Sequence, residues 1–144
     1  MSESIIVNFD RQYEPEIRRI RNSVFTGEQN VHENVDFDGR DPEAVHVLVR
    51  PEDSFVGTGR MLMDGHIGRL AVLKPYRGKG FGAEAVSALI AEAKRTGIKR
   101  VYLGAQIHAV GFYQKLGFHE YGSIFMDGPG IEHIHMEKII RDWS

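Results

Sequence analysis

An abrupt change of hydrophobic period at residues 70–83 constrains the fold of this chain more than any other feature. Apolar residues of a predicted strand run to Leu73, a basic, glycine-rich turn comes next, and an amphipathic helix begins at once at Phe81. The first turn of a helix carries backbone N–H groups without intrahelical partners and lies at the positive end of the helix dipole. The sequence therefore predicts a strand-to-helix turn that can bind an anion.

The composition of that turn supports a phosphate ligand. Gly78, Gly80 and Gly82 lack Cβ atoms, so an anion could approach the backbone closely, and Arg77 and Lys79 add positive charge. Backbone N–H groups at a helix start, together with basic side chains, favour a phosphate or diphosphate.

Known phosphate-binding turns differ in the residues that come after their glycines. A P-loop needs Ser or Thr after its lysine, but Lys79 is succeeded by glycine. A dinucleotide-binding fingerprint needs an acidic residue about 20 positions later, where basic residues stand. The third pattern is Arg-x-x-Gly-x-Gly, formed by Arg77, Gly80 and Gly82. Taken alone, the segment could also be a plain connection with solvated basic residues.

Hydrophobic periodicity predicts the remaining elements. The expected strands cover residues 4–9, 45–49, 55–63, 66–73, 100–103, 118–127 and 133–138. The expected helices lie around residues 17–25, 81–96 and 107–116. Asp64-Gly65 predicts a tight hairpin, so residues 45–73 should form an antiparallel meander. The order and the length of 144 residues indicate one domain, residues 1–144, of mixed α/β or α+β class.

Charged residues surround the first predicted helix. Arg18, Arg19 and Arg21 fall mostly off its apolar stripe, so we expect them on a solvated face. Residues 30–42 are polar and acidic and should form a long solvated loop. A calcium loop starting at Asp36 fails because its required Gly and Glu positions hold other residues. No metal site is therefore expected.

The composition excludes several classes of protein. A net charge of −2 argues against a nucleic-acid binder. The absence of cysteine excludes disulfides, thiolate metal sites and cysteine nucleophiles. There is no signal peptide and no apolar run of the roughly 18 residues that a membrane span needs. We therefore expect a soluble cytoplasmic protein with neither nucleic acid nor membrane as a partner.

Two motifs together carry a family resemblance. The Arg-x-x-Gly-x-Gly pattern at the strand-to-helix turn resembles the acetyl-CoA-binding motif of the GNAT N-acetyltransferase superfamily. Residues 112–118, Phe-Tyr-x-Lys-Leu-Gly-Phe, resemble that family's second signature. Residues 24–41, which begin with Val-Phe-x-x-Glu-Gln, and residues 130–136 are similar to a poorly characterised GNAT branch.

The resemblance implies a fold and a donor substrate. The fold would be a single GNAT-like domain with a mixed central sheet of about seven strands, flanked by helices, in which the central strands splay apart. The donor would be acetyl-CoA, with its diphosphate on the turn and its pantetheine arm along the preceding strand. The residues expected to bind it are Leu70, Ala71, Val72, Arg77, Gly78, Lys79, Gly80, Phe81, Gly82, Ala83 and Gln106.

The resemblance also suggests catalytic residues. Tyr113 matches the family tyrosine that protonates the leaving thiolate, although a packed aromatic residue would look the same. The attacking amine must lose a proton to a base, for which Glu28 is the first candidate and His135 a rival. Arg60, Glu28 and His133 are the expected substrate-binding residues, with an ordinary sheet arginine as the alternative for Arg60.

The expected reaction is acetyl transfer to a primary amine of a small molecule by direct attack in a ternary complex, since no covalent nucleophile is evident. The alternatives are a non-catalytic acyl-CoA-binding sensor or regulatory module, and a nucleotide-binding protein. The carboxylates of residues 30–42 could attract a cationic amine. Exposed strand edges would allow two chains to pair as a homodimer.

Overall fold

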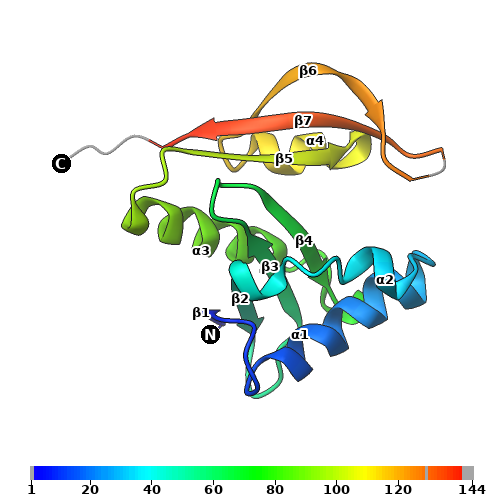
Figure 1. The fold of residues 1–144 in the computed structure, drawn as a ribbon, viewed down its shortest axis with the longest axis vertical. Coiled ribbons are helices and arrows are strands. Elements are labelled where there is room, and N and C mark those ends of the chain that lie inside the picture. The colour runs from blue at the N-terminus through cyan, green and yellow to red at the C-terminus, as the bar shows by residue number, and fades with distance from the viewer. Residues whose placement is uncertain (1, 129, 141–144) are drawn as a thin grey trace.

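The computed structural model describes residues 2–128 and 130–140, which form seven strands in two antiparallel sheets (Figure 1). The first sheet has the order β1-β2-β3-β4, with bounds β1 Glu3–Val7, β2 Val45–Arg50, β3 Gly57–Met61 and β4 Ile67–Val72. The second has the order β5-β7-β6, with bounds β5 Arg100–Gln106, β6 His119–Met126 and β7 Glu132–Ile139. The expected mixed α+β fold with an antiparallel meander is confirmed.

The helices are α1 Glu14–Arg21, α2 Glu33–Asp36, α3 Phe81–Thr96 and α4 Val110–Gln114. The two longer helices, α1 and α3, pack on opposite faces of the first sheet, whereas α4 contacts β5 and β6 of the second sheet. A π-helical segment, Asn22–Glu28, continues α1, and short 3₁₀ turns occupy Asp41–Glu43, Lys74–Tyr76 and Ile107–Ala109. No helix in the described part of the chain is long and apolar enough to cross a bilayer.

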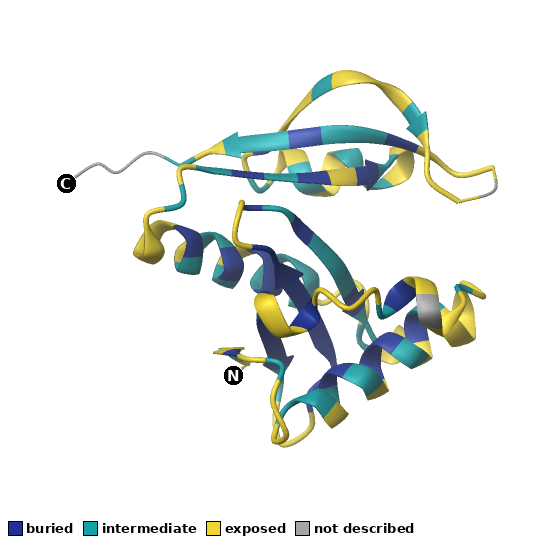
Figure 2. Cartoon of the chain, in the orientation of Figure 1, coloured by how far each residue is buried: buried dark blue, intermediate teal, exposed yellow. Residues whose placement is uncertain are grey.

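Alternation along the strands builds a core on each face of the first sheet (Figure 2). In β2, Val47 and Val49 pack with the buried residues of α3, whereas Leu48 packs with Ile17 and Ile20 of α1. We call these two faces the α3 side and the α1 side. Leu103 and Met136 of the second sheet join the α3-side core, so the two sheets share that core.

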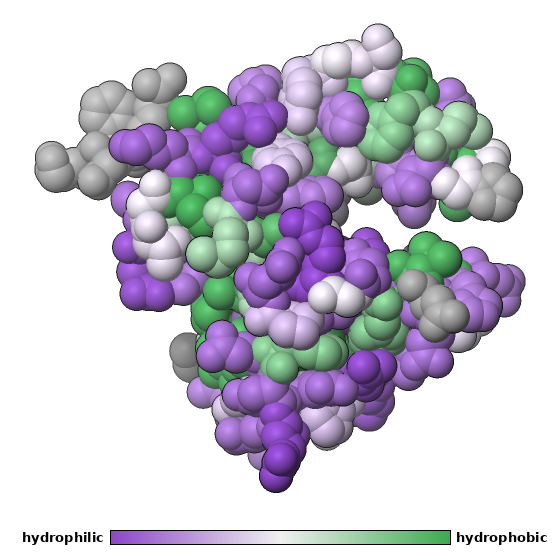
Figure 3. Space-filling view, in the orientation of Figure 1, coloured by the Kyte–Doolittle hydropathy of each residue, from purple (hydrophilic) through white to green (hydrophobic). Residues whose placement is uncertain are grey.

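Backbone pairing joins the two sheets at one place in the described residues. His66, which directly precedes β4, forms an isolated parallel bridge with Tyr102 of β5, and the two rings stack with centroids 4.8 Å apart. Beyond this bridge the strands diverge, so the expected splayed central strands are present (Figure 1). Figure 3 shows the molecule hollowed between the second sheet and the region of α2.

The solvated loop predicted at residues 30–42 is wrong at Asp36 and Asp41, although most of the segment is exposed. Arg21, Asp36 and Asp41 are each at most 2% exposed, and Arg21 bonds Asp36 Oδ1 at 3.0 Å and Asp41 Oδ1 at 2.8 Å. The prediction of an exposed Arg21 is wrong for the same reason. Buried charges need partners, and these opposite charges lie far apart in sequence, so no local pattern reveals their pairing.

Candidate active site

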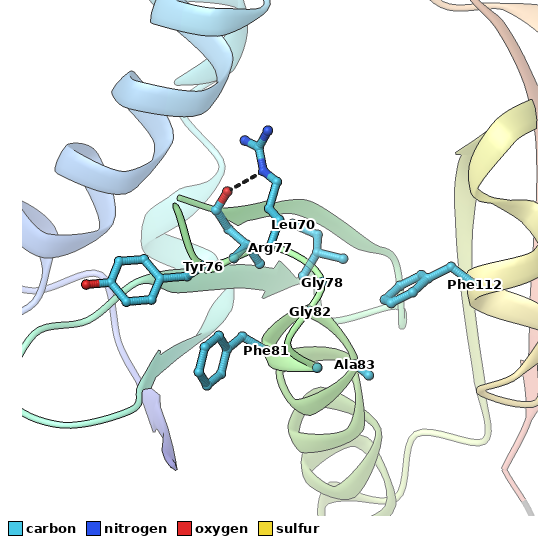
Figure 4. Close-up of a pocket in the computed structure, with 10 residues that line it drawn as sticks. Leu70, Tyr76, Arg77, Gly78, Phe81, Gly82, Ala83 and Phe112 are labelled. Carbon is cyan, nitrogen blue, oxygen red and sulfur yellow. Dashed lines mark hydrogen bonds between the residues drawn. The ribbon is translucent and has the colours of Figure 1, made fainter. Parts of the chain in front are cut away.

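A groove of about 470 Å³ lies beside β4 where α3 begins (Figure 4). Its size falls within the range of small-molecule and cofactor sites. Its lining contains most of the expected donor-binding residues. The lining residues are Leu70, Val72, Tyr76, Arg77, Gly78, Gly80, Phe81, Gly82, Ala83 and Phe112.

The turn before α3 exposes bare backbone. Gly78 and Gly80 have φ of +76° and +90°, in the left-handed region that favours glycine. A Cβ atom at either position would meet nothing within 4 Å. The first hydrogen bond of α3 runs from Glu84 N to Gly80 O at 3.0 Å, so the N–H groups at the helix start have no intrahelical partner. This geometry fits a diphosphate.

A β4 edge faces the split between the sheets. Leu73 N donates to Val56 O at 2.9 Å, toward β3. Neighbouring residues of a strand point their N–H and C=O groups to opposite edges, so those of Val72 point away from β3. Arg77 Nε donates to Val72 O at 2.9 Å on this side (Figure 4). The Val72 N–H is therefore directed into the split.

Arg77 also contacts Glu28, the first candidate base. Arg77 Nη2 donates to Glu28 Oε2 at 2.6 Å. Glu28 ends the π-helical segment, so this contact ties that segment to the turn before α3. The structure thus brings together two expected site residues that are 49 positions apart.

Tyr113 lies beside the groove rather than in its lining. Its ring packs edge-on against Phe112 at 4.9 Å and Phe118 at 5.8 Å between centroids. Burial raises the pKa of Tyr113 to about 12, so its hydroxyl remains protonated at neutral pH. Its neighbour Phe112 reaches the groove: the Cζ atom would lie 3.4 Å from a Cβ added at Gly82. Sequence reasoning missed Phe112 and Tyr76 as lining residues, although Phe112 belongs to the second motif.

Three other expected donor residues do not line this groove. Ala71 is buried in the α1-side core, and Lys79 is not in the lining. Gln106, at the end of β5, instead lines a second, smaller pocket of about 400 Å³ with His108 and Glu132.

His133 and His135 lie together on one face of β7. The Phe125 ring stacks on His135 at 4.3 Å and lies 5.6 Å from His133 between centroids. The structure thus brings both candidate histidines to a single aromatic cluster on the second sheet.

Arg60 is not in the groove. It is buried, donates to both carboxylate oxygens of Asp38 at 2.9 and 2.8 Å, and donates to Asp41 at 3.0 Å. The hydrogen bonds from Arg60 hold the pKa of Asp38 far below its usual range. Burial alone would raise the pKa of Asp41, but hydrogen bonds and charge from Arg21 and Arg60 lower it. These carboxylates are already paired with arginines, which argues against the expectation that they attract a cationic amine.

Metal ligands are not gathered in the described structure. Among residues 2–128 and 130–140, no group of three or more His, Asp or Glu side chains is arranged to hold a metal ion.

Comparison with known proteins decides the family. Residues 14–140 match the model of the acetyltransferase (GNAT) domain. The chain belongs to the GNAT acetyltransferase family. This membership confirms the resemblance carried by the two motifs, and it implies acyl-CoA-dependent acetyl transfer as the general activity.

Relatives of this GNAT chain support the assignment. It is 41% identical over 131 residues to the uncharacterised Bacillus subtilis protein YyaT, covering 87% of this chain and 88% of YyaT. It is 34% identical over 122 residues to the uncharacterised B. subtilis N-acetyltransferase YjcF, covering 83% and 87%. The crystal structure of Escherichia coli ElaA superposes with a TM-score of 0.85 at 29% identity, covering 96% of this chain and 99% of ElaA.

Proposed function

We propose that this protein is an acetyl-CoA-dependent N-acetyltransferase that acetylates a primary amine of a small molecule, and that residues 1–144 act as a single domain. The observation that carries the proposal is the bare backbone turn at Gly78 and Gly80, which lies beside the splayed edge of β4. A donor with a diphosphate and an amide-bearing arm matches both features.

The donor would be bound mainly by backbone groups. The N–H groups at the start of α3 would hold the diphosphate, with charge added by Lys79 on the same turn. The outward-facing backbone of Leu70 and Val72 would pair with the pantetheine arm as an added strand would. Phe112 would close the groove from α4.

The chemistry would need three groups of the chain. The amine nitrogen attacks the thioester carbon, forming a C–N bond while the C–S bond breaks. The Val72 N–H would stabilise the developing oxyanion, a contribution of about 3–4 kcal/mol when well placed. Glu28 would take a proton from the substrate ammonium so that the free amine can attack, and Tyr113 would give its proton to the leaving thiolate.

His135 is the alternative base. It lies with Phe125 on the second sheet, whereas Glu28 contacts the donor turn through Arg77. Glu28→Gln and His135→Gln variants, compared by kcat at saturating donor, would separate them, because only loss of the true base lowers kcat strongly.

The function is tested in two steps. Calorimetry should register CoA and acetyl-CoA binding, with no competition by ATP. Thiol release across a panel of amines should then show turnover, with intersecting lines in two-substrate kinetics and no acetylated enzyme by mass spectrometry. Binding without turnover would support the non-catalytic acyl-CoA sensor instead, and absence of CoA binding at any temperature would refute both.

A further inference from the structure

The gap between the diverging strands β4 and β5, here called the split, lies beyond the bridge that joins the sheets. Two glycines leave it open on the α1 side. Ile67 and Leu103 belong to the α3-side core, so the residues on either side of them point the other way. These are His66, which directly precedes β4, and Gly68 of β4, together with Tyr102 and Gly104 of β5. His66 and Tyr102 close the end of the split by stacking, and the next two residues on that face have no side chains.

The two glycines differ in what surrounds them. A Cβ atom at Gly68 would meet nothing within 4 Å. A Cβ atom at Gly104 would lie 3.0 Å from Phe125 Cζ, so the tip of this ring occupies the space of a residue-104 side chain. One side of the opening is therefore empty, and the other is bordered by an aromatic ring.

Phe125 belongs to a continuous set of rings. Its ring lies against His135 at 4.3 Å and His133 at 5.6 Å, and His135 stacks in turn on Tyr121 at 5.4 Å. We call Tyr121, Phe125, His133 and His135 the ring array. The side chains of Phe125, His135 and Tyr121 are only partly buried, so they keep accessible surface next to the opening.

The charged groups beside the ring array have partners. Arg100 bonds Glu137 at 2.8 Å and lies over the rings of Tyr102 and Tyr121. Across the split, Arg69 contacts Asp38 at 3.2 Å and donates to the Asp36 carbonyl at 2.9 Å. Among the residues that the structure describes, these pairs leave rings, rather than unpaired charge, as the recognition surface beside the opening.

The donor groove opens on the opposite face. It is lined by Leu70, which packs with the α3-side core, and by Phe112 of α4. An amine that attacks through the split therefore has to approach from the α1 side, past Gly68 and Gly104.

We propose that the acceptor is a primary amine bearing an aryl group without a carboxylate, and that this aryl group stacks on the ring array while the amine enters between Gly68 and Gly104. This inference rests on the proposed acetyltransferase function and adds the substrate class. Aromatic pairs gain about 0.5–1.5 kcal/mol beyond burial of their area, which corresponds to a factor of about two to ten.

The kinetic test compares 2-phenylethylamine with 2-cyclohexylethylamine, which is apolar and similar in size but has no π system. The parent enzyme should show a kcat/KM about two- to tenfold higher for the aromatic amine, and a lower value for L-phenylalanine. Phe125→Leu should bring the ratio of the two amines close to one while acetyl-CoA binding is unchanged.

Ile124→Ala is the matched control. Ile124 is the preceding residue of β6, is 55% exposed and does not belong to the ring array, so this variant should keep the parent ratio. Equal kcat/KM for the two amines in the parent, a ratio that Phe125→Leu does not alter, or a preference for L-phenylalanine would each overturn the inference while leaving acetyl transfer established.

A binding measurement does not depend on turnover. In the CoA-bound protein, 2-phenylethylamine should shift the ring-proton NMR signals of His133 and His135, assigned with His133→Gln and His135→Gln, because a stacked aryl group adds ring current. The cyclohexyl amine should produce a clearly smaller shift. Equal shifts, or none, would overturn the inference even if CoA binds normally.

Discussion

At the residue scale, burial keeps Tyr113, the proposed general acid, in its protonated form. A phenol with a pKa raised to about 12 by burial stays protonated throughout the neutral range, and its ring orientation is held by two edge-on aromatic contacts. The thiolate that leaves acetyl-CoA needs a proton, and a positioned acid typically contributes about 10²–10⁴-fold.

Tyr113→Phe should therefore lower kcat by about 10²-fold or more, with acetyl-CoA affinity within about twofold of the parent. The phenylalanine ring preserves the packing, so thermal stability should change little. Stopped-flow thiol release and calorimetry measure the two quantities. Tyr13→Phe, in the α1-side core region, is the control and should retain full activity; unchanged kcat in Tyr113→Phe would remove the acid role.

Single residues were predictable where a motif fixes them. The glycines of the turn could be predicted to line a groove, because a close approach to backbone needs missing Cβ atoms at fixed spacing, and the structure places Gly78, Gly80 and Gly82 in its lining. Phe112 was not assigned to the groove, because which of two adjacent aromatics reaches it depends on how α4 packs on Gly82 of α3. That contact joins segments 30 residues apart and has no local signature.

At the element scale, α3 has a left-handed glycine at each end. Gly80 precedes it with φ +90° and Gly97 succeeds it with φ +84°, and a Cβ atom at either would meet nothing within 4 Å. The two positions carry the same backbone strain when substituted, but only Gly80 lines the groove. They therefore form a matched pair that separates stability from binding.

Gly80→Ala and Gly97→Ala should each lower the free energy of unfolding by roughly 1–2 kcal/mol, measured by urea denaturation. Gly80→Ala should also weaken CoA binding by about tenfold or more, because relieving the strain moves the N–H groups at the helix start. Gly97→Ala should bind CoA like the parent. An equal loss of affinity in both variants would mean that the turn does not bind the donor directly.

Helices and strands with a clear hydrophobic periodicity were predicted well, and irregular elements were not. The helix at 81–96 and all strands could be predicted from alternation or helical spacing together with glycine and proline punctuation. The π-helical segment Asn22–Glu28 and α2 were missed, because local propensity does not reveal them. The pairing of Asp36 in α2 with the buried Arg21 joins residues that are distant in sequence.

At the scale of the whole molecule, Arg21 links α1, α2 and the segment that leads into β2. Its guanidinium is 1% exposed and bonds the carboxylates of Asp36 and Asp41. Arg21→Met should lower the free energy of unfolding by about 3–5 kcal/mol, because each buried carboxylate loses one of its two arginine partners: Asp36 keeps only Arg69 and Asp41 keeps only Arg60. Arg40→Met, which removes an exposed pair with Glu43, should cost at most about 1 kcal/mol. Similar losses in both variants, measured by chemical denaturation, would contradict this.

The histidines buried in the first sheet and at the bridge make the stability of the whole fold depend on pH. Burial is the largest influence and lowers the pKa of His46 and of His66 below 6.5, although nearby acidic groups oppose the shift. As pH falls below 6.5, these two histidines become protonated in the unfolded chain but stay neutral in the folded chain until a lower pH. Stability should therefore be full above pH 6.5 and decline below it, by up to about 1.4 kcal/mol per pH unit for each histidine.

His46→Gln should make this decline of stability shallower between pH 6.5 and pH 5, whatever its effect on absolute stability, because it removes one of the two histidines whose pKa is lowered by folding. Glutamine also retains a donor for the Asp41 carbonyl, which His46 Nε2 contacts at 3.0 Å. His119→Gln, at a side chain 65% exposed, should leave the slope unchanged. Denaturation midpoints at a series of pH values give the slopes. The pKa values of Asp38 and Asp41 are lowered below 3.8, so these carboxylates lose their ion pairs only at a pH below this range. Equal slopes for the parent and His46→Gln would show that His46 has the same pKa in the folded and unfolded chain.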